Sequence, residues 1–190
     1  MILHDYKAIH VHIPKCAGMS IEEAFGMAII KDKRGSRGSR HFHKSFVINK
    51  FGSKIWNSYF KFAFVRNPWE RFVSLYFFRK KHQRSHIRGR SFKACMMNFF
   101  KEYTPRDSSL HFWIMEGDKQ VVDFVGRFEN LHEDFAKVCS IIGANVTLNH
   151  INKTNHTHYS HYYDDECLQF VTENCKRDIE LFGYTFEDKR

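Results

Sequence analysis

Residues 9–25, IHVHIPKCAGMSIEEAF, decide the fold of this chain. Three apolar residues alternate with two histidines before the proline, which is the two-residue period of a β-strand. Pro14 ends that strand because it has no N–H to give to a neighbouring strand. Ser20 stands three residues before Glu23 and an apolar run surrounds them, which is the spacing of a capping box. The stretch therefore predicts a strand, a tight turn and a helix that begins at Ser20.

The turn between them, PKCAGMS, has the features of an anion site. A helix N-terminus presents backbone N–H groups without partners and the positive end of the helix dipole. Lys15 adds a positive charge, and Gly18 lets the backbone approach a ligand closely. The turn is not a Walker A loop, because its lysine precedes Gly18 instead of following a second glycine. It therefore indicates a site for a phosphate-type anion, with plain α/β scaffolding as the alternative.

Composition limits the class of protein. The chain has 190 residues, of which 43% are hydrophobic, so we expect one folded domain over residues 1–190 with a substantial core. The formal net charge of +9 favours an anionic partner, such as a nucleotide, a nucleic acid, a polysaccharide or a membrane surface. The five cysteines contain no C-x-x-C pair, which favours reduced thiols over a disulfide framework.

Targeting signals are also missing from the sequence pattern. We find neither a signal peptide nor an apolar run as long as a membrane span. We therefore expect a soluble, cytoplasmic chain without a membrane segment, or a Golgi-luminal one if the sequence is a trimmed catalytic domain.

A second informative stretch is KFAFVRNPWERFVSLYFFR, residues 61–79. The apolar run at 62–65 predicts a central strand that is covered on both faces. Asn67 is a good N-cap and Pro68 a good first residue of the helix that follows. Arg66 then sits at the carboxyl end of a buried strand, where open α/β sheets bind ligands. It is either an anion clamp or the partner of a nearby carboxylate, and its position favours the clamp.

The rest of the chain completes an α/β pattern. We expect loops at residues 31–44 and 105–119. Gly143 and Gly183 are placed as the C-terminal stops of two helices. Strands separated by helices indicate an α/β domain with a mainly parallel sheet. The remaining predicted elements are helices at 92–103, 131–142 and 165–182 and a strand at 121–125.

Four blocks of the sequence resemble the sulfotransferases that use 3′-phosphoadenosine-5′-phosphosulfate (PAPS). HVHIPKCAGMS resembles their H-I-P-K-T-A-G-T-S loop, and FKFAFVRNPWERFVSLYFF resembles their second signature. DFVGRFENLHEDF and INKTNHTHYSHYYDDE resemble two further blocks of the carbohydrate branch, which includes the heparan and chondroitin sulfotransferases. The blocks follow in the family's order from about residue 8 to 186. The resemblance implies a P-loop NTPase-like α/β fold with a mainly parallel central sheet flanked by helices.

The resemblance also implies which residues hold the donor. Lys15, Gly18 and Ser20 fall in the loop that holds the 5′-phosphosulfate. Cys16 and Met19 lie in the same loop, where they replace the two threonines that the family usually has.

The other end of the donor is assigned in the same way. Arg66 and Ser74 match the pair that holds the 3′-phosphate, and Lys153 matches a loop that closes over the nucleotide. PAPS carries phosphates at two ends of one nucleoside, so two strand–turn–helix units with a cation at each turn agree with this assignment.

The implied reaction transfers a sulfuryl group from PAPS to an acceptor hydroxyl, which the family likeness makes a carbohydrate hydroxyl, and leaves adenosine 3′,5′-bisphosphate (PAP). Lys15 would stabilise the charge that grows on the oxygen bridging to the 5′-phosphate. The acceptor needs a general base with a pKa near neutrality. In the resembling family a histidine between the first helix and the second signature often has this task. His41 is the first candidate and His43 the second, and the fallback bases are Glu22, Glu23 and Glu129.

Three other classes of protein remain as alternatives. A zinc protein is suggested by the histidine clusters, which lack paired cysteines or an H-E-x-x-H frame. A basic nucleic-acid-binding module is suggested by charge, but most aromatic residues fall on apolar faces. A P-loop phosphotransferase is disfavoured by the lysine order and the lack of a clear Walker B partner. We therefore expect a PAPS-dependent O-sulfotransferase with no bound metal and no nucleic-acid partner.

Overall fold

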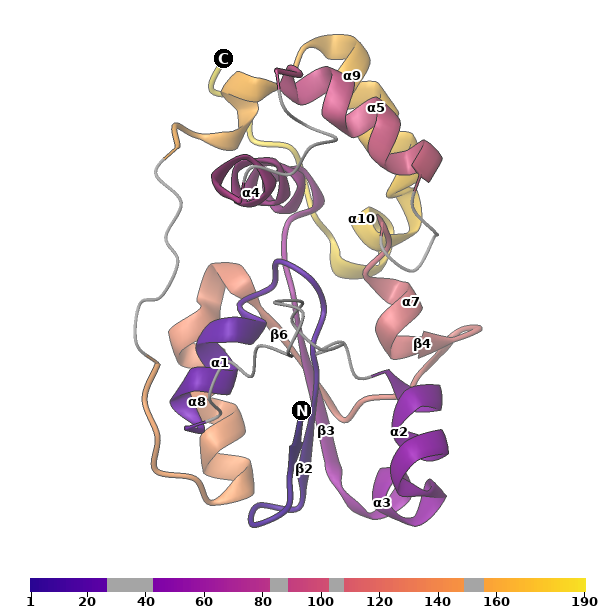
Figure 1. Ribbon diagram of the computed structural model, residues 1–190, viewed down its shortest axis with the longest axis vertical. Helices are drawn as coiled ribbons and strands as arrows, with labels where there is room; N and C mark the ends of the chain where they lie inside the picture. The colour runs from indigo at the N-terminus through magenta and orange to yellow at the C-terminus, as the bar shows by residue number, and fades with distance from the viewer. Residues whose placement is uncertain (27–42, 83–88, 103–107, 149–155) are drawn as a thin grey trace. The chain divides into compact units, whose positions relative to one another are not determined.

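The computed structural model groups the chain into two compact units, each assembled from two separate segments (Figure 1). The first unit contains Met1–Val65 and Trp113–Asn152, and the second contains Arg66–Phe112 and Lys153–Arg190. A single catalytic domain over residues 1–190 stays a prediction. The residues that the structure describes are 1–26, 43–82, 89–102, 108–148 and 156–190.

The first unit holds the sheet. Its elements, in chain order, are β1 (Ile2–Leu3), β2 (Ala8–Val11), α1 (Gly18–Ala24), α2 (Lys44–Phe51), α3 (Ser53–Ser58), β3 (Phe60–Val65), β4 (Met115–Glu116), β5 (Lys119–Gln120), β6 (Phe124–Arg127), the 3₁₀ turn η2 (Phe128–Asn130) and α8 (Leu131–Ile142).

The main sheet has the strand order β1-β2-β3-β6. β2, β3 and β6 run parallel, and the short β1 pairs antiparallel with β2 at the edge. Val11 lies opposite Ala63, and Val65 lies opposite Arg127, so the parallel strands end at the same edge of the sheet. Figure 1 shows α1 and α8 on one side of the sheet and α2 and α3 on the other. A mixed α/β architecture with a largely parallel central sheet is therefore confirmed.

The two central strands are covered on both faces, as helices on both sides require. Phe62 and Phe64 are fully buried in β3, which confirms the predicted central strand. A side chain at Gly126 would place its Cβ only 2.4 Å from the ring of Phe64, so the neighbouring strand needs a glycine there. In β2 and just after it, His10 and His12 are as buried as the apolar residues with which they alternate. The alternation therefore marks a strand but not an exposed face.

The second unit is helical. Its elements are α4 (Pro68–Lys81), α5 (Phe92–Glu102), the 3₁₀ turn η3 (Tyr159–Tyr162), α9 (Asp165–Asn174) and α10 (Lys176–Phe182), and α7 (His111–Ile114) begins in this unit and ends in the first.

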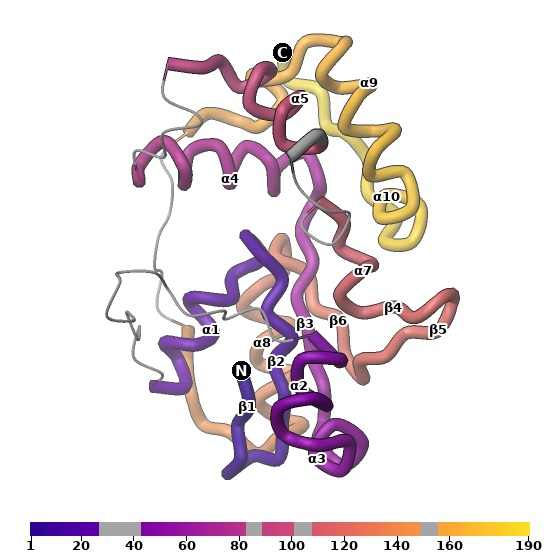
Figure 2. The backbone as a smooth tube through the Cα atoms, turned by 45° about the vertical axis from the view of Figure 1, so that its right-hand side comes forward, coloured from indigo at the N-terminus to yellow at the C-terminus, as the bar shows by residue number. Residues whose placement is uncertain are grey.

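Helix α4 is the centre of this second unit. Asn67 caps it and Pro68 is its first residue, as predicted. The ring of Phe72 packs against Phe99 and Phe100 of α5, with ring centroids 5.4 and 5.0 Å apart. Figure 2 shows α5 and α9 following the same course beside each other. The helices of this unit thus bury an aromatic core of their own.

Some predicted boundaries are wrong. The helix expected at 165–182 is two helices, because the backbone at Cys175 leaves helical values (φ −109°, ψ 14°) while the apolar spacing continues across it. The strand expected at 121–125 lies at 124–127, where pairing with β3 sets the register. The expected loop at 105–119 contains α7 and the β4–β5 hairpin among its described residues.

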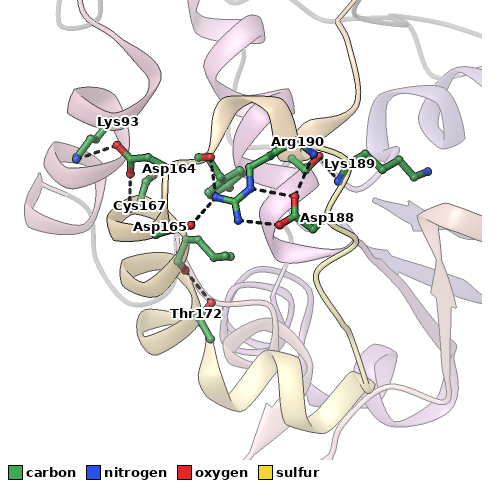
Figure 3. A network of polar contacts seen from close by, with 11 residues as sticks. Lys93, Asp164, Asp165, Cys167, Thr172, Asp188, Lys189 and Arg190 are labelled. Carbon is green, nitrogen blue, oxygen red and sulfur yellow. Dashed lines mark hydrogen bonds and ion pairs between the residues drawn. The ribbon is translucent and has the colours of Figure 1, made fainter.

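Ion pairs on the surface of the second unit hold the last residues of the chain against α9 (Figure 3). Arg190 contacts Asp165 and Asp188, each at 2.7 Å. The guanidinium lowers the pKa of Asp188 to about 2. Lys93 of α5 pairs with Asp164 at 2.9 Å, and Asp164 also caps α9. The network joins α5, α9 and the C-terminal residues.

Within the described ranges, we find no helix whose length and hydropathy would let it cross a lipid bilayer.

Candidate functional site

The turn after β2 has an unusual backbone. Lys15 (φ 69°) and Ala17 (φ 65°) both adopt the left-handed conformation, which side chains other than glycine rarely adopt. Each such residue costs on the order of 1–3 kcal/mol and persists only where the surrounding structure imposes it. Here β2 is anchored in the sheet, and the N–H groups of Ser20 and Ile21 donate to the carbonyl of Ala17. Strain of this kind is typical of ligand-binding turns.

Helix α1 begins earlier than predicted. Its first residue is Gly18 and its N-cap is Ala17, which makes no side-chain capping bond. Ser20 lies inside the first turn, so the expected Ser20–Glu23 capping box is wrong. The left-handed backbone at Ala17 turns the chain directly into the helix, which is why no polar cap is used.

A buried pair of side chains supports this turn. Nδ1 of His12 lies 2.7 Å from a carboxylate oxygen of Glu22, and the two residues are only 5% and 6% exposed. A Cβ on Gly18 would lie 2.2 Å from the His12 ring. Gly18 therefore makes room for His12, whereas the sequence suggested that it makes room for a ligand. Sequence reasoning missed His12, although it is the first residue of the quoted H-I-P-K match.

The neighbouring His10 is neutral in the folded chain. Its ring stacks on Phe62 and on His12, with centroids 5.0 and 5.7 Å apart. Burial, assisted by His12, holds the pKa of His10 well below its usual range.

The other predicted residues of the turn differ in how deeply their side chains are buried. Lys15 and Met19 are half-buried, while Cys16 is buried and its thiol donates to the carbonyl of Pro14 at 3.6 Å. The position at which the resembling family has a threonine thus faces the interior of this unit. Lys15 is the cationic residue of the turn.

The second predicted cation begins the second unit. Arg66 directly follows β3 and is 6% exposed, and its Nη2 donates to a carboxylate oxygen of Glu70 at 3.0 Å. This is the ion pair that the sequence left as the alternative to an anion clamp. Ser74 is buried in α4, two turns after its start. Its match to a 3′-phosphate site stays a prediction.

Comparison with known families decides the class of the chain. A family model with the description "Sulfotransferase family" matches residues 1–185. The chain belongs to the sulfotransferase family. It is therefore a transferase, and sulfuryl transfer is the activity that membership supports.

This sulfotransferase is also similar to an uncharacterized protein of Archaeoglobus fulgidus. The two are 34% identical over 100 residues, which are 51% of this chain and 78% of that protein. No solved structure gives a significant match.

The candidate bases of the sulfotransferase fall in different places. His43 is the N-cap of α2, and its Nδ1 accepts from the backbone N–H of Phe46 at 3.3 Å. A neutral imidazole that accepts through Nδ1 carries its proton on Nε2, so its lone pair is directed at the helix start. The role of His43 as a general base stays a prediction. His41 and Lys153 lie outside the described residues.

The three fallback carboxylates differ in burial. Glu22 is the buried partner of His12, and its role as a base stays a prediction. Glu23 and Glu129 are exposed, on α1 and η2. Across the described ranges, no three His, Cys, Asp or Glu side chains are grouped so that they could hold a metal ion.

Proposed function

We propose that this sulfotransferase uses PAPS as its donor and a carbohydrate hydroxyl as its acceptor. The observation that carries the proposal is the strained turn with Lys15 between a buried strand and a helix, in a chain that matches the family over residues 1–185. The resemblance of four sequence blocks to the carbohydrate branch supports the acceptor class.

The 5′-phosphosulfate is assigned to the turn. Left-handed residues turn successive N–H groups toward one side and so make an anion-binding concavity. Lys15 would stabilise the negative charge that develops on the oxygen between sulfur and phosphorus. Gly18 and Ser20, with Cys16 and Met19, would contribute the backbone of the loop.

The 3′-phosphate is assigned to Arg66 and Ser74, with Lys153 closing over the nucleotide. Support comes from topology, because β2 and β3 are adjacent parallel strands and the turns that follow them leave the same edge of the sheet. The carboxylate of Glu70 would hold the Arg66 guanidinium in place until a phosphate binds.

The chemical step is an in-line displacement at sulfur. The bond from the acceptor oxygen to sulfur forms as the bond from sulfur to the 5′-phosphate oxygen breaks, and PAP leaves. The hydroxyl proton passes to a histidine base, for which His41 is the sequence-derived candidate.

Calorimetric titration with PAP tests this proposal. We expect the wild-type chain to bind PAP, and Lys15→Ala to weaken binding at least about tenfold, or ~1.4 kcal/mol. Lys54→Ala is the matched control, because Lys54 is an exposed lysine of α3. Absence of PAP binding, or a preference for ATP with Mg²⁺, would overturn the proposal. An acceptor screen with labelled PAPS and desulfated glycosaminoglycans then tests the acceptor class.

A further inference from the structure

We propose that His111 is the general base of the transfer step and that Asp178 holds it in the required tautomer. The inference rests on the proposed function and names a different base from the one that the sequence suggested. His111 begins α7 and Asp178 lies in α10, 67 residues apart in the sequence and both in the second unit.

The hydrogen bonds around Asp178 decide the tautomer of His111. Oδ2 of Asp178 accepts from the backbone N–H of Leu110 at 2.6 Å, and Oδ1 accepts from the backbone N–H of His111 at 2.8 Å. Nδ1 of His111 lies 2.6 Å from the same Oδ1. Because both carboxylate oxygens act as acceptors, Nδ1 must supply the proton of this contact. The neutral ring therefore carries its lone pair on Nε2, where a general base needs it.

Exposure separates His111 from His12, which also contacts a buried carboxylate. The side chain of Asp178 is 1% exposed and that of His111 is 22% exposed, so the ring runs from a buried anchor toward the surface. His12 also contacts a carboxylate through Nδ1, but its side chain is only 6% exposed and packs against Gly18. His111 thus combines a fixed tautomer with access to a substrate.

The segment that carries His111 is held from two sides. Nη1 of Arg71 in α4 donates to the carbonyl of Ser108 at 2.6 Å, and Asp178 in α10 accepts from the backbone N–H groups of Leu110 and His111. α4 also carries Ser74, and Arg66 precedes it, so the proposed 3′-phosphate residues and the proposed base belong to one packed unit. A fixed base is what an in-line transfer requires, because misplacement by about 1 Å can reduce the rate about 100-fold.

The proton has a defined path in this arrangement. Nε2 takes the hydroxyl proton as the acceptor oxygen bonds to sulfur and PAP leaves, and the resulting imidazolium is stabilised by the carboxylate of Asp178. The thiol of Cys175 lies near that carboxylate, and Arg71 lies near the same thiol. Burial, together with Asp178, raises the pKa of Cys175 to about 12, so its thiol stays protonated and does not compete for the proton. Asp178 is then a positioning residue.

The experiment compares His111→Asn and Asp178→Asn with the wild-type chain. The control is His161→Asn, because His161 is an exposed histidine in the same unit. Three quantities are measured: PAP affinity by calorimetry, release of PAP from labelled PAPS with water or desulfated heparan as the acceptor, and the protonated ring nitrogen of His111 by ¹⁵N NMR.

We expect His111→Asn to bind PAP within about threefold of wild type and to lose about 100-fold or more in PAPS turnover, the usual contribution of a general base. Asp178→Asn should lose turnover and shift the ring proton toward Nε2. The control should match wild type in all three measurements.

The possible failures are distinguishable. If the wild-type chain does not bind PAP, the proposed function itself fails. If PAP binds but His111→Asn turns over like the control, only the role of His111 is overturned. If a variant does not fold, NMR of the wild-type chain decides, since a neutral ring with its proton on Nε2 contradicts the proposal.

Discussion

At the scale of single residues, the turn after β2 is shaped by what lies beneath it. The imidazole of His12 occupies the space that a side chain at position 18 would need, and Glu22 holds that imidazole in place. The shape of the proposed donor loop therefore depends on the packing of His12 against Gly18, which is present without a ligand.

Gly18→Ala tests this contact. The added methyl group would lie 2.2 Å from the His12 ring, so either the ring or the backbone must move. We expect the free energy of unfolding to fall by about 1–3 kcal/mol, as overpacking usually does. Urea unfolding measures this change. In the double variant with His12→Ala the ring is gone, so the added cost of Gly18→Ala should shrink; an unchanged cost would contradict the contact.

His10 makes stability depend on pH. Burial holds its pKa well below the value of about 6.5 that an unfolded histidine has. Below pH 6.5 the unfolded chain therefore binds a proton that the folded chain does not, and the free energy of unfolding falls by up to ~1.4 kcal/mol per pH unit. The contribution is complete above pH 6.5 and is lost as the pH falls toward the folded pKa.

His10→Phe provides the comparison. Nδ1 of His10 has no hydrogen-bond partner among the described residues, and the ring already stacks on Phe62, so phenylalanine should fit. Urea unfolding at pH 7.5 and pH 5.5 should show a smaller loss of stability for the variant than for wild type. Equal losses would show that other groups control the acid sensitivity.

At the scale of elements, the start of α4 was predicted from two adjacent residues. Asn67 accepts from the N–H groups of Trp69 and Glu70 at 3.0 and 3.3 Å, and its amide donates to the carbonyl of Thr185. The pair Asn-Pro predicted this helix start because the cap and the restricted φ of proline act within one turn.

Asn67→Ala should lower the free energy of unfolding by about 1 kcal/mol, because it removes that cap. Asn130→Ala is a matched control, since Asn130 is the N-cap of α8 but makes no side-chain capping bond. Chemical denaturation of the two variants should therefore give different losses. Similar losses would mean that the cap of α4 adds nothing.

The other helix boundaries were predicted correctly only where the signal lies within a few residues of the boundary. α8 was predicted with its boundaries and its glycine stop because its apolar face and its left-handed Gly143 are local features. The start of α1 was wrong because the strained backbone at Ala17 replaces the polar cap. The break at Cys175 has no local signal, since apolar residues keep their helical spacing through it.

At the scale of the whole molecule, the net charge favours an anionic ligand. The formal net charge of +9 comes from 30 Lys and Arg against 21 Asp and Glu. An excess of positive charge attracts a donor that carries several negative charges, and salt screens this attraction over about 8–10 Å.

PAP affinity should therefore decrease as NaCl rises from about 50 to 300 mM. Calorimetry at several salt concentrations measures this dependence. Lys15→Ala should show a weaker salt dependence than wild type, because one cation of the proposed site is missing. Affinity that is independent of salt would argue against a phosphate-binding site.

The sequence alone determined the local features of this sulfotransferase: the strand period before Pro14, the Asn-Pro helix start, and the cations Lys15 and Arg66 that follow two strands. These features depend on neighbours within a few residues, so the chain carries them wherever it folds. Only the tertiary structure decided that His12 fills the space next to Gly18, that Arg66 pairs with Glu70, and that Asp178 meets His111 across 67 residues. Such contacts depend on how separate elements pack, and the spacing of residue types along one chain does not encode which of them will meet.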